Sequence, residues 1–117
     1  MTTKIVIEGV VAGLKGSNGL IRQHWAKARK VKEEYQCIIA SQTNNKHKGR
    51  VKIYYVGYKT HLMDWDNFCA SFKHLGDALL KQKVIKDDKP EIVVSFIPTQ
   101  IKCRRIDQRV EITIEDV

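Results

Sequence analysis

A long helical stripe between two β-rich runs constrains the fold of this chain more than any other feature. Between residues 20 and 41 apolar side chains recur at steps of three and four, the spacing of one face of an α-helix: Ile21, Trp25, Ala28, Val31, Tyr35 and Ile38. Residues 4–11 and 51–58, on either side, are rich in β-branched and aromatic residues, which is typical of strands. This alternation predicts an α/β fold.

The second half of the chain continues the alternation. Residues 67–83 repeat Phe68, Phe72, Leu75 and Leu79 at helical spacing, and Asp66 is placed to cap the first turn of this second helix. A turn at residues 86–90 precedes strands expected at residues 91–97 and 108–114. We therefore expect one α/β domain over residues 1–117, with a mixed sheet, two main helices and the order β-α-β-α-β-β.

The charge of the chain favours a polyanionic partner. The sequence holds 21 Lys and Arg against 13 Asp and Glu, which gives a formal net charge of +8. Binding of Lys and Arg to phosphates releases condensed counterions, so such an excess favours nucleic acid, although basic domains also bind ribosomes and membranes. Candidate phosphate contacts are Arg22 and Lys27 on the first helix, Lys73 on the second, and Arg104 before the last strand.

Cysteine spacing and hydropathy indicate the cellular environment. Cys37, Cys69 and Cys103 are odd in number and lack a C-x-x-C pair, which favours reduced, buried thiols over disulfides or zinc. No apolar run is long enough to cross a bilayer, and the first residues lack the apolar core of a signal peptide. We expect a protein with no membrane association in the cytoplasm of a prokaryotic or phage-infected cell.

Asp64 and Asp66 stand where a strand is expected to meet the second helix. Residues two apart in an extended chain point to the same side, so the two carboxylates could converge, with Trp65 facing away from them and packing. Carboxylate oxygens are the ligands that Mg²⁺ prefers. Lys73 leans toward the start of its helix and could stabilise charge on a phosphoryl group. Taken alone, an aspartate such as Asp66 is most often just a helix cap, and one such as Asp88, shortly before Pro90, is most often just part of a turn.

The longer pattern resembles a known family. Residues 63–79 read MDWDNFCASFKHLGDAL, and residues 84–88 read VIKDD. Together they resemble the signature of the RusA family of Holliday-junction resolvases: an Asp-x-Asp-Asn entry, a helix with Lys-x-x-x-Asp-Ala-Leu, and a closing Asp-Asp. Two positions depart from the pattern. Lys73 stands three residues further from the entry than in the shortest members, and Lys83 occupies a helix end where the family often has glycine.

The resemblance implies a function and a set of site residues. Asp64, Asp66 and Asp88 match the family's acidic metal-binding residues, and Lys73 matches its essential lysine. The implied activity is Mg²⁺-dependent cleavage of four-way DNA junctions in recombination and repair, with Mn²⁺ as a possible substitute and no small-molecule cofactor. A C2 homodimer would supply two self-contained sites for paired, symmetric cuts.

Two other functions fit the same sequence. The chain could be a basic nucleic-acid-binding protein that keeps the fold and does not cut. It could also be an unrelated ribosome-associated α/β domain whose aspartates act only as caps and turns.

Overall fold

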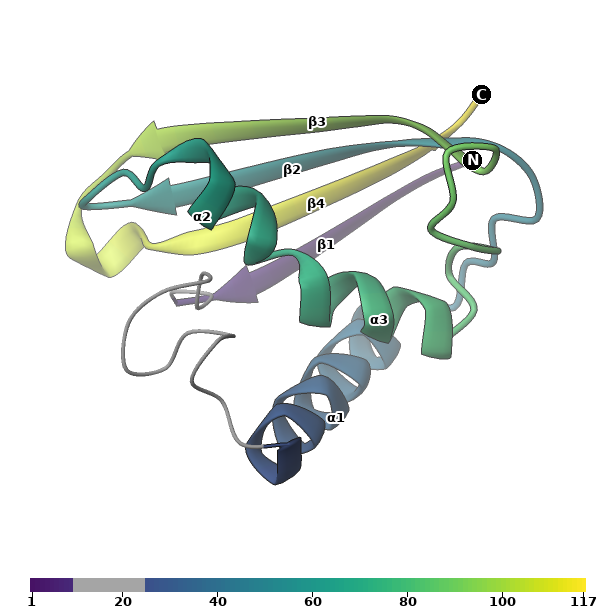
Figure 1. Cartoon of the computed structure of the whole chain (residues 1–117), viewed down its shortest axis with the longest axis horizontal. Helices are drawn as coiled ribbons and strands as arrows, with labels where there is room; N and C mark the ends of the chain where they lie inside the picture. The colour runs from purple at the N-terminus through teal and green to yellow at the C-terminus, as the bar shows by residue number, and fades with distance from the viewer. Residues whose placement is uncertain (10–24) are drawn as a thin grey trace.

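The computed structural model describes residues 1–9 and 25–117. Its elements follow the predicted order β-α-β-α-β-β, except that the second helix is divided in two (Figure 1). They are β1 (Thr2–Glu8), α1 (Trp25–Gln42), β2 (Val51–Lys59), α2 (Trp65–Ala70), α3 (Lys73–Lys81), β3 (Val93–Lys102), the short 3₁₀ helix η2 (Arg105–Asp107) and β4 (Arg109–Asp116). The parts of the predicted first strand and first helix at residues 10–11 and 20–24 lie outside the described residues.

The four strands form the predicted mixed sheet, in the order β1-β4-β2-β3. β4 is antiparallel to both β1 and β2, whereas β2 and β3 run parallel. Figure 1 shows the three helices on one side of the sheet. Their apolar faces meet the sheet in one buried core, which includes Ile39 of α1, Phe68 of α2, Leu75 of α3 and Ile53 of β2.

The break between α2 and α3 is fixed by a buried tyrosine. The Ser71 hydroxyl donates to the carbonyl of Phe68, and it accepts a hydrogen bond from the Tyr55 hydroxyl on β2, 2.6 Å away. Burial raises the pKa of Tyr55, so this donor stays protonated. At the break, the Phe72 amide bonds to the carbonyl of Cys69, three residues back rather than four. Because α3 starts again at Lys73, the predicted helix over residues 67–83 becomes two shorter ones.

Buried polar residues join the two ends of the chain. The side chain of His47 is fully buried, with one ring nitrogen 2.7 Å from Thr3 Oγ1 and the other 2.7 Å from Asp116 Oδ1. Asp116 also pairs with the terminal ammonium of Met1 at 3.1 Å. Figure 1 shows both termini at the same end of the sheet.

The structure bears on two predictions, the state of the cysteines and the absence of a membrane-spanning segment. All three cysteines are free thiols, as predicted, but Cys37 and Cys69 are exposed, so the prediction that they are buried is wrong. Cys37 stands on α1 and Cys69 on α2. Among the helices described, none is both long and apolar enough to cross a membrane.

Lys83 ends α3 in a strained conformation. Its φ of 59° lies in the left-handed region, which glycine adopts without steric cost. The Val84 amide bonds to the carbonyl of Leu79, and the Lys83 amide to that of Leu80, so the chain closes a Schellman turn. This turn directs the chain back toward β3, and Lys83 bears a steric cost there that glycine would avoid.

Replacing Lys83 by glycine should stabilise the fold. The substitution Lys83→Gly removes the Cβ penalty of the left-handed conformation, offset in part by the entropy of glycine in the unfolded chain, and we expect a gain of about 0.5–1 kcal/mol. Urea denaturation followed by circular dichroism measures it. The matched variant Lys81→Gly, inside α3, should instead lose about 1 kcal/mol. A lower urea midpoint for Lys83→Gly would contradict this account of the turn.

Candidate functional site

Asp64 and Asp66 lie at the start of α2 with their carboxylates available. Asp64, not Asp66, holds the cap position, with an extended backbone (φ −62°, ψ 155°), and its side chain makes no capping hydrogen bond. Asp66 lies in the first helical turn. Both residues are exposed, and within the described part of the chain neither carboxylate makes a hydrogen bond or an ion pair. The predicted capping role of Asp66 is therefore wrong.

Two contacts position the turn that carries these aspartates. The Gln100 side chain on β3 accepts from the Met63 amide and donates to the Met63 carbonyl, both at 2.8 Å, so it pairs with the turn as a neighbouring strand would. On β2, Gly57 faces the Phe68 ring so closely that a Cβ added there would lie 2.5 Å from a ring carbon. Phe68 in turn stacks on Tyr55, with ring centroids 4.8 Å apart. The turn is thus held from two strands.

Adding a methyl group at Gly57 should displace α2. Phe68 is fully buried and cannot yield, so we expect Gly57→Ala to cost about 1–3 kcal/mol and to lower the melting temperature by several degrees. Differential scanning calorimetry measures the shift. Gly49→Ala is the matched control, because nothing lies within 4 Å of a Cβ there. Equal stability of the two variants would show that the Gly57 contact does not hold α2.

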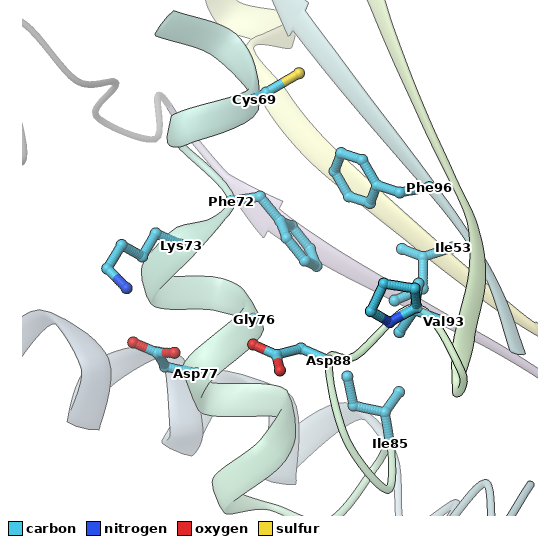
Figure 2. A pocket seen from close by; sticks show the side chains of 11 residues that line it. Ile53, Cys69, Phe72, Lys73, Gly76, Asp77, Ile85, Asp88, Val93 and Phe96 are labelled. Carbon is cyan, nitrogen blue, oxygen red and sulfur yellow. The ribbon is translucent and has the colours of Figure 1, made fainter. Parts of the chain in front are cut away.

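Lys73 and Asp88 line a second feature, a pocket of about 300 Å³ between α3 and the end of the sheet. Figure 2 shows Asp88 reaching from the turn before β3 toward Gly76, with Lys73 and Asp77 projecting from α3. The wall is largely apolar and includes Ile53, Phe72, Ile85, Pro90, Val93 and Phe96. Asp77 is ion-paired with Lys32 of α1 at 3.0 Å. Lys73 is exposed, and the Asp77 carboxylate is already paired with another lysine.

The turn before β3 is organised by Asp87. Its carboxylate accepts a hydrogen bond from the Asp88 amide at 2.8 Å. That bond is the main reason that the pKa of Asp87 lies below its ordinary value, and nearby Lys89 contributes as well. Asp87 therefore acts as the structural member of the pair, and Asp88 is the one that lines the pocket.

The structure joins some of the predicted site residues and separates others. Lys73 and Asp88 share the pocket, whereas Asp64 and Asp66 do not line it. The pocket reaches as far as Cys69 of α2 and Lys73, the first residue of α3. Among residues 1–9 and 25–117, no three Asp, Glu, His or Cys side chains are grouped so that they could hold a metal ion. The oxygen ligands suit Mg²⁺, but a self-contained site of all three aspartates does not form within the described chain.

The predicted phosphate contacts fall in different places. Arg22 lies outside the described residues. Lys27 is exposed on the first turn of α1, and Arg104 is exposed but paired with Asp107 at 2.9 Å. Trp65 is 56% exposed, and its ring lies edge-to-face with that of Phe68, with centroids 6.2 Å apart, so the predicted packing is only partial. An exposed tryptophan beside two aspartates offers a surface on which a base can stack.

Sequence reasoning missed Lys59. This lysine is 3% exposed and lies on the face of β2 that also carries Val51, Ile53 and Tyr55. The signal was present in the sequence, because the alternation of β2 places every second residue from Val51 to Lys59 on the buried face.

No protein-family model matches the chain, and no curated protein matches it. The resemblance to the RusA family therefore rests on residues 63–88, and the activity that it implies is a proposal.

Proposed function

We propose that this protein is a metal-dependent endonuclease that acts as a homodimer on branched DNA, with four-way junctions as its substrate. The observation that carries the proposal is the pair Asp64 and Asp66, held at an anchored turn, with both carboxylates exposed and without an ion pair among residues 1–9 and 25–117. Two neighbouring exposed carboxylates of this kind can supply oxygen ligands to a divalent cation that keeps several of its waters.

Other features support the same proposal. Lys73 is exposed at the mouth of the pocket, where its ammonium can bind a phosphate. Trp65 stands between the two aspartates with more than half of its surface exposed. The excess of Lys and Arg would supply most of the affinity for DNA, while the shape of the junction would supply most of the selectivity.

The separation of the aspartates favours a shared site in the proposed dimer. Mg²⁺, or Mn²⁺ in its place, is usually held by few carboxylates and keeps several waters. Asp64 and Asp66 of one subunit meet that need in part, and Asp88 would come from the partner, since within the described part of one chain the three aspartates are not grouped so that they could hold a metal ion. This replaces the expectation of self-contained sites.

Asparagine substitutions of the three aspartates test the proposed metal-dependent cleavage, and a heterodimer of two such variants tests whether the site is shared between subunits. Asp64→Asn, Asp66→Asn and Asp88→Asn should each reduce junction cleavage in Mg²⁺ by several orders of magnitude, with junction binding equal or tighter, because a lost carboxylate weakens metal binding and also repels phosphate less. Strand-resolved gels measure cleavage, and circular dichroism confirms folding. Asp87→Asn is the matched control and should stay active, because its amide oxygen can still accept from the Asp88 amide.

Heterodimers of Asp66→Asn and Asp88→Asn subunits, purified with two different tags, distinguish the arrangements. A shared site leaves one site intact, so the heterodimer should nick one strand although neither parent cuts. Self-contained sites would leave the heterodimer inactive. Full activity of two of the three asparagine homodimers would contradict the nuclease proposal itself, and wild-type binding without cleavage in Mg²⁺ would favour a non-cleaving nucleic-acid-binding protein.

Junction affinity should fall steeply as salt rises. Each phosphate that Lys or Arg neutralises contributes about 0.9 to the slope of log affinity against log salt, so several contacts predict a slope of several units. Fluorescence anisotropy with a labelled four-way junction, in EDTA to prevent cleavage, measures this slope. Lys73→Met should reduce it by about one unit if its ammonium contacts phosphate. A flat salt dependence would point to a partner other than nucleic acid.

A further inference from the structure

β2 ends in a buried lysine that no acidic residue neutralises. Lys59 is 3% exposed, and its Nζ has one hydrogen-bond partner, the sulfur of Met63 at 3.8 Å. A thioether sulfur is a weak acceptor, and in the described part of the chain no carboxylate pairs with this ammonium. Burial lowers the pKa of Lys59, as expected where a charge is separated from water without a counterion.

A second lysine stands beside it on the same face of the sheet. Lys102 pairs with Lys59 in the parallel register of β2 and β3, so both side chains leave the sheet on the helix side. Lys102 is exposed and, among the residues that the structure describes, forms no ion pair. Neighbouring like charges on adjacent strands destabilise a sheet. Two lysines that pair with no acid among the described residues are thus register partners at the carboxyl ends of two parallel strands.

This end of the sheet is rigid. Gln100, two residues before Lys102, is hydrogen-bonded to both backbone groups of Met63, and the Cys103 amide bonds to the Lys59 carbonyl at 2.9 Å. The two lysines are therefore held in a fixed relation to each other and to the turn that begins at Met63. An anion bound between them would satisfy charges that the fold itself leaves unbalanced.

We propose that Lys59 and Lys102 form a phosphate-binding site at the carboxyl ends of β2 and β3, with Lys59 as its inner wall and Lys102 at its mouth. A lysine ammonium is a compact charge with three donors and suits a phosphate oxygen. The ligand is a phosphate group, from a phosphodiester backbone or from a free or terminal phosphate. The site does not depend on cleavage, so it stands or falls separately from the nuclease proposal.

The competing explanation is that Lys59 serves the fold alone, and the two explanations predict opposite effects. Lys59→Met keeps an unbranched side chain, one atom shorter than lysine, and removes the charge. If the role of the ammonium is to bind an anion, the variant without ligand should melt at a higher temperature than wild type without ligand. The substitution removes a buried charge that has no counterion in the ligand-free protein. If the ammonium stabilises the fold, the variant should melt lower.

The experiment uses the full chain in EDTA, without junction DNA. Melting temperature and calorimetric binding are measured against inorganic phosphate, and in parallel against a DNA dinucleotide that carries only a phosphodiester, with sodium chloride at equal ionic strength as the reference. Wild type should melt higher with at least one of these two ligands than with chloride. Whichever ligand produces the rise identifies the source of the phosphate.

The variants decide whether the lysines are responsible. Lys59→Met should weaken binding about tenfold or more, as expected for loss of a hydrogen bond from a charged donor, and Lys102→Met should weaken it as well. Lys52→Met, an exposed lysine on the opposite face of β2, is the matched control and should keep wild-type affinity. No rise above chloride in wild type, or a rise that survives in Lys59→Met, would overturn the proposal.

Discussion

The close approach of α2 to β2 at Gly57 is the contact on which the rest of the site depends. Phe68 occupies the space that a Cβ at Gly57 would need, and it stacks on Tyr55. Tyr55 also bonds to Ser71, which ends α2, and its ring meets that of Phe72 at 5.0 Å. One aromatic cluster therefore sets both the turn that carries Asp64 and the pocket that Phe72 lines. A change in this aromatic cluster would therefore move both the turn that carries Asp64 and the pocket.

The residues that depart from local structural preferences lie mainly at the candidate sites. Such departures are expected where a functional residue lowers the stability of the fold. Lys83 adopts a conformation suited to glycine, and the turn it closes leads the chain back so that Asp88 faces α3. Lys59 holds a charge on a buried face. Asp64 occupies a cap position without capping. By contrast, buried His47 is fully hydrogen-bonded, which marks it as a structural residue.

The element order followed from the sequence because periods of 3.6 and 2.0 residues are local properties of the chain. The break at Ser71 was not predictable in this way, since it depends on a hydroxyl sixteen residues away on β2. The convergence of Asp64 and Asp66 was argued from an extended chain, but only Asp64 is extended and helix begins at Trp65. The pattern that resembles the RusA family says nothing of distance, so it could not show that Asp64, Asp66 and Asp88 are not grouped as metal ligands within the described part of the chain.

The distribution of ion pairs explains why the unpaired groups matter together. Several acids are neutralised: Glu33 by Arg29, Asp77 by Lys32, Asp107 by Arg104, and Glu111 by Lys4 and Arg109. Asp64, Asp66, Lys59 and Lys102 are among the residues that form no ion pair within the described part of the chain. Met63 joins the two sets, since it contacts the Lys59 ammonium and directly precedes Asp64. In the proposed enzyme, a cation on the aspartates would reduce their repulsion of a phosphate that the lysines attract, and by linkage the phosphate would strengthen cation binding equally. Two acidic and two basic residues linked through Met63 are thus suited to binding a metal ion and a phosphate together.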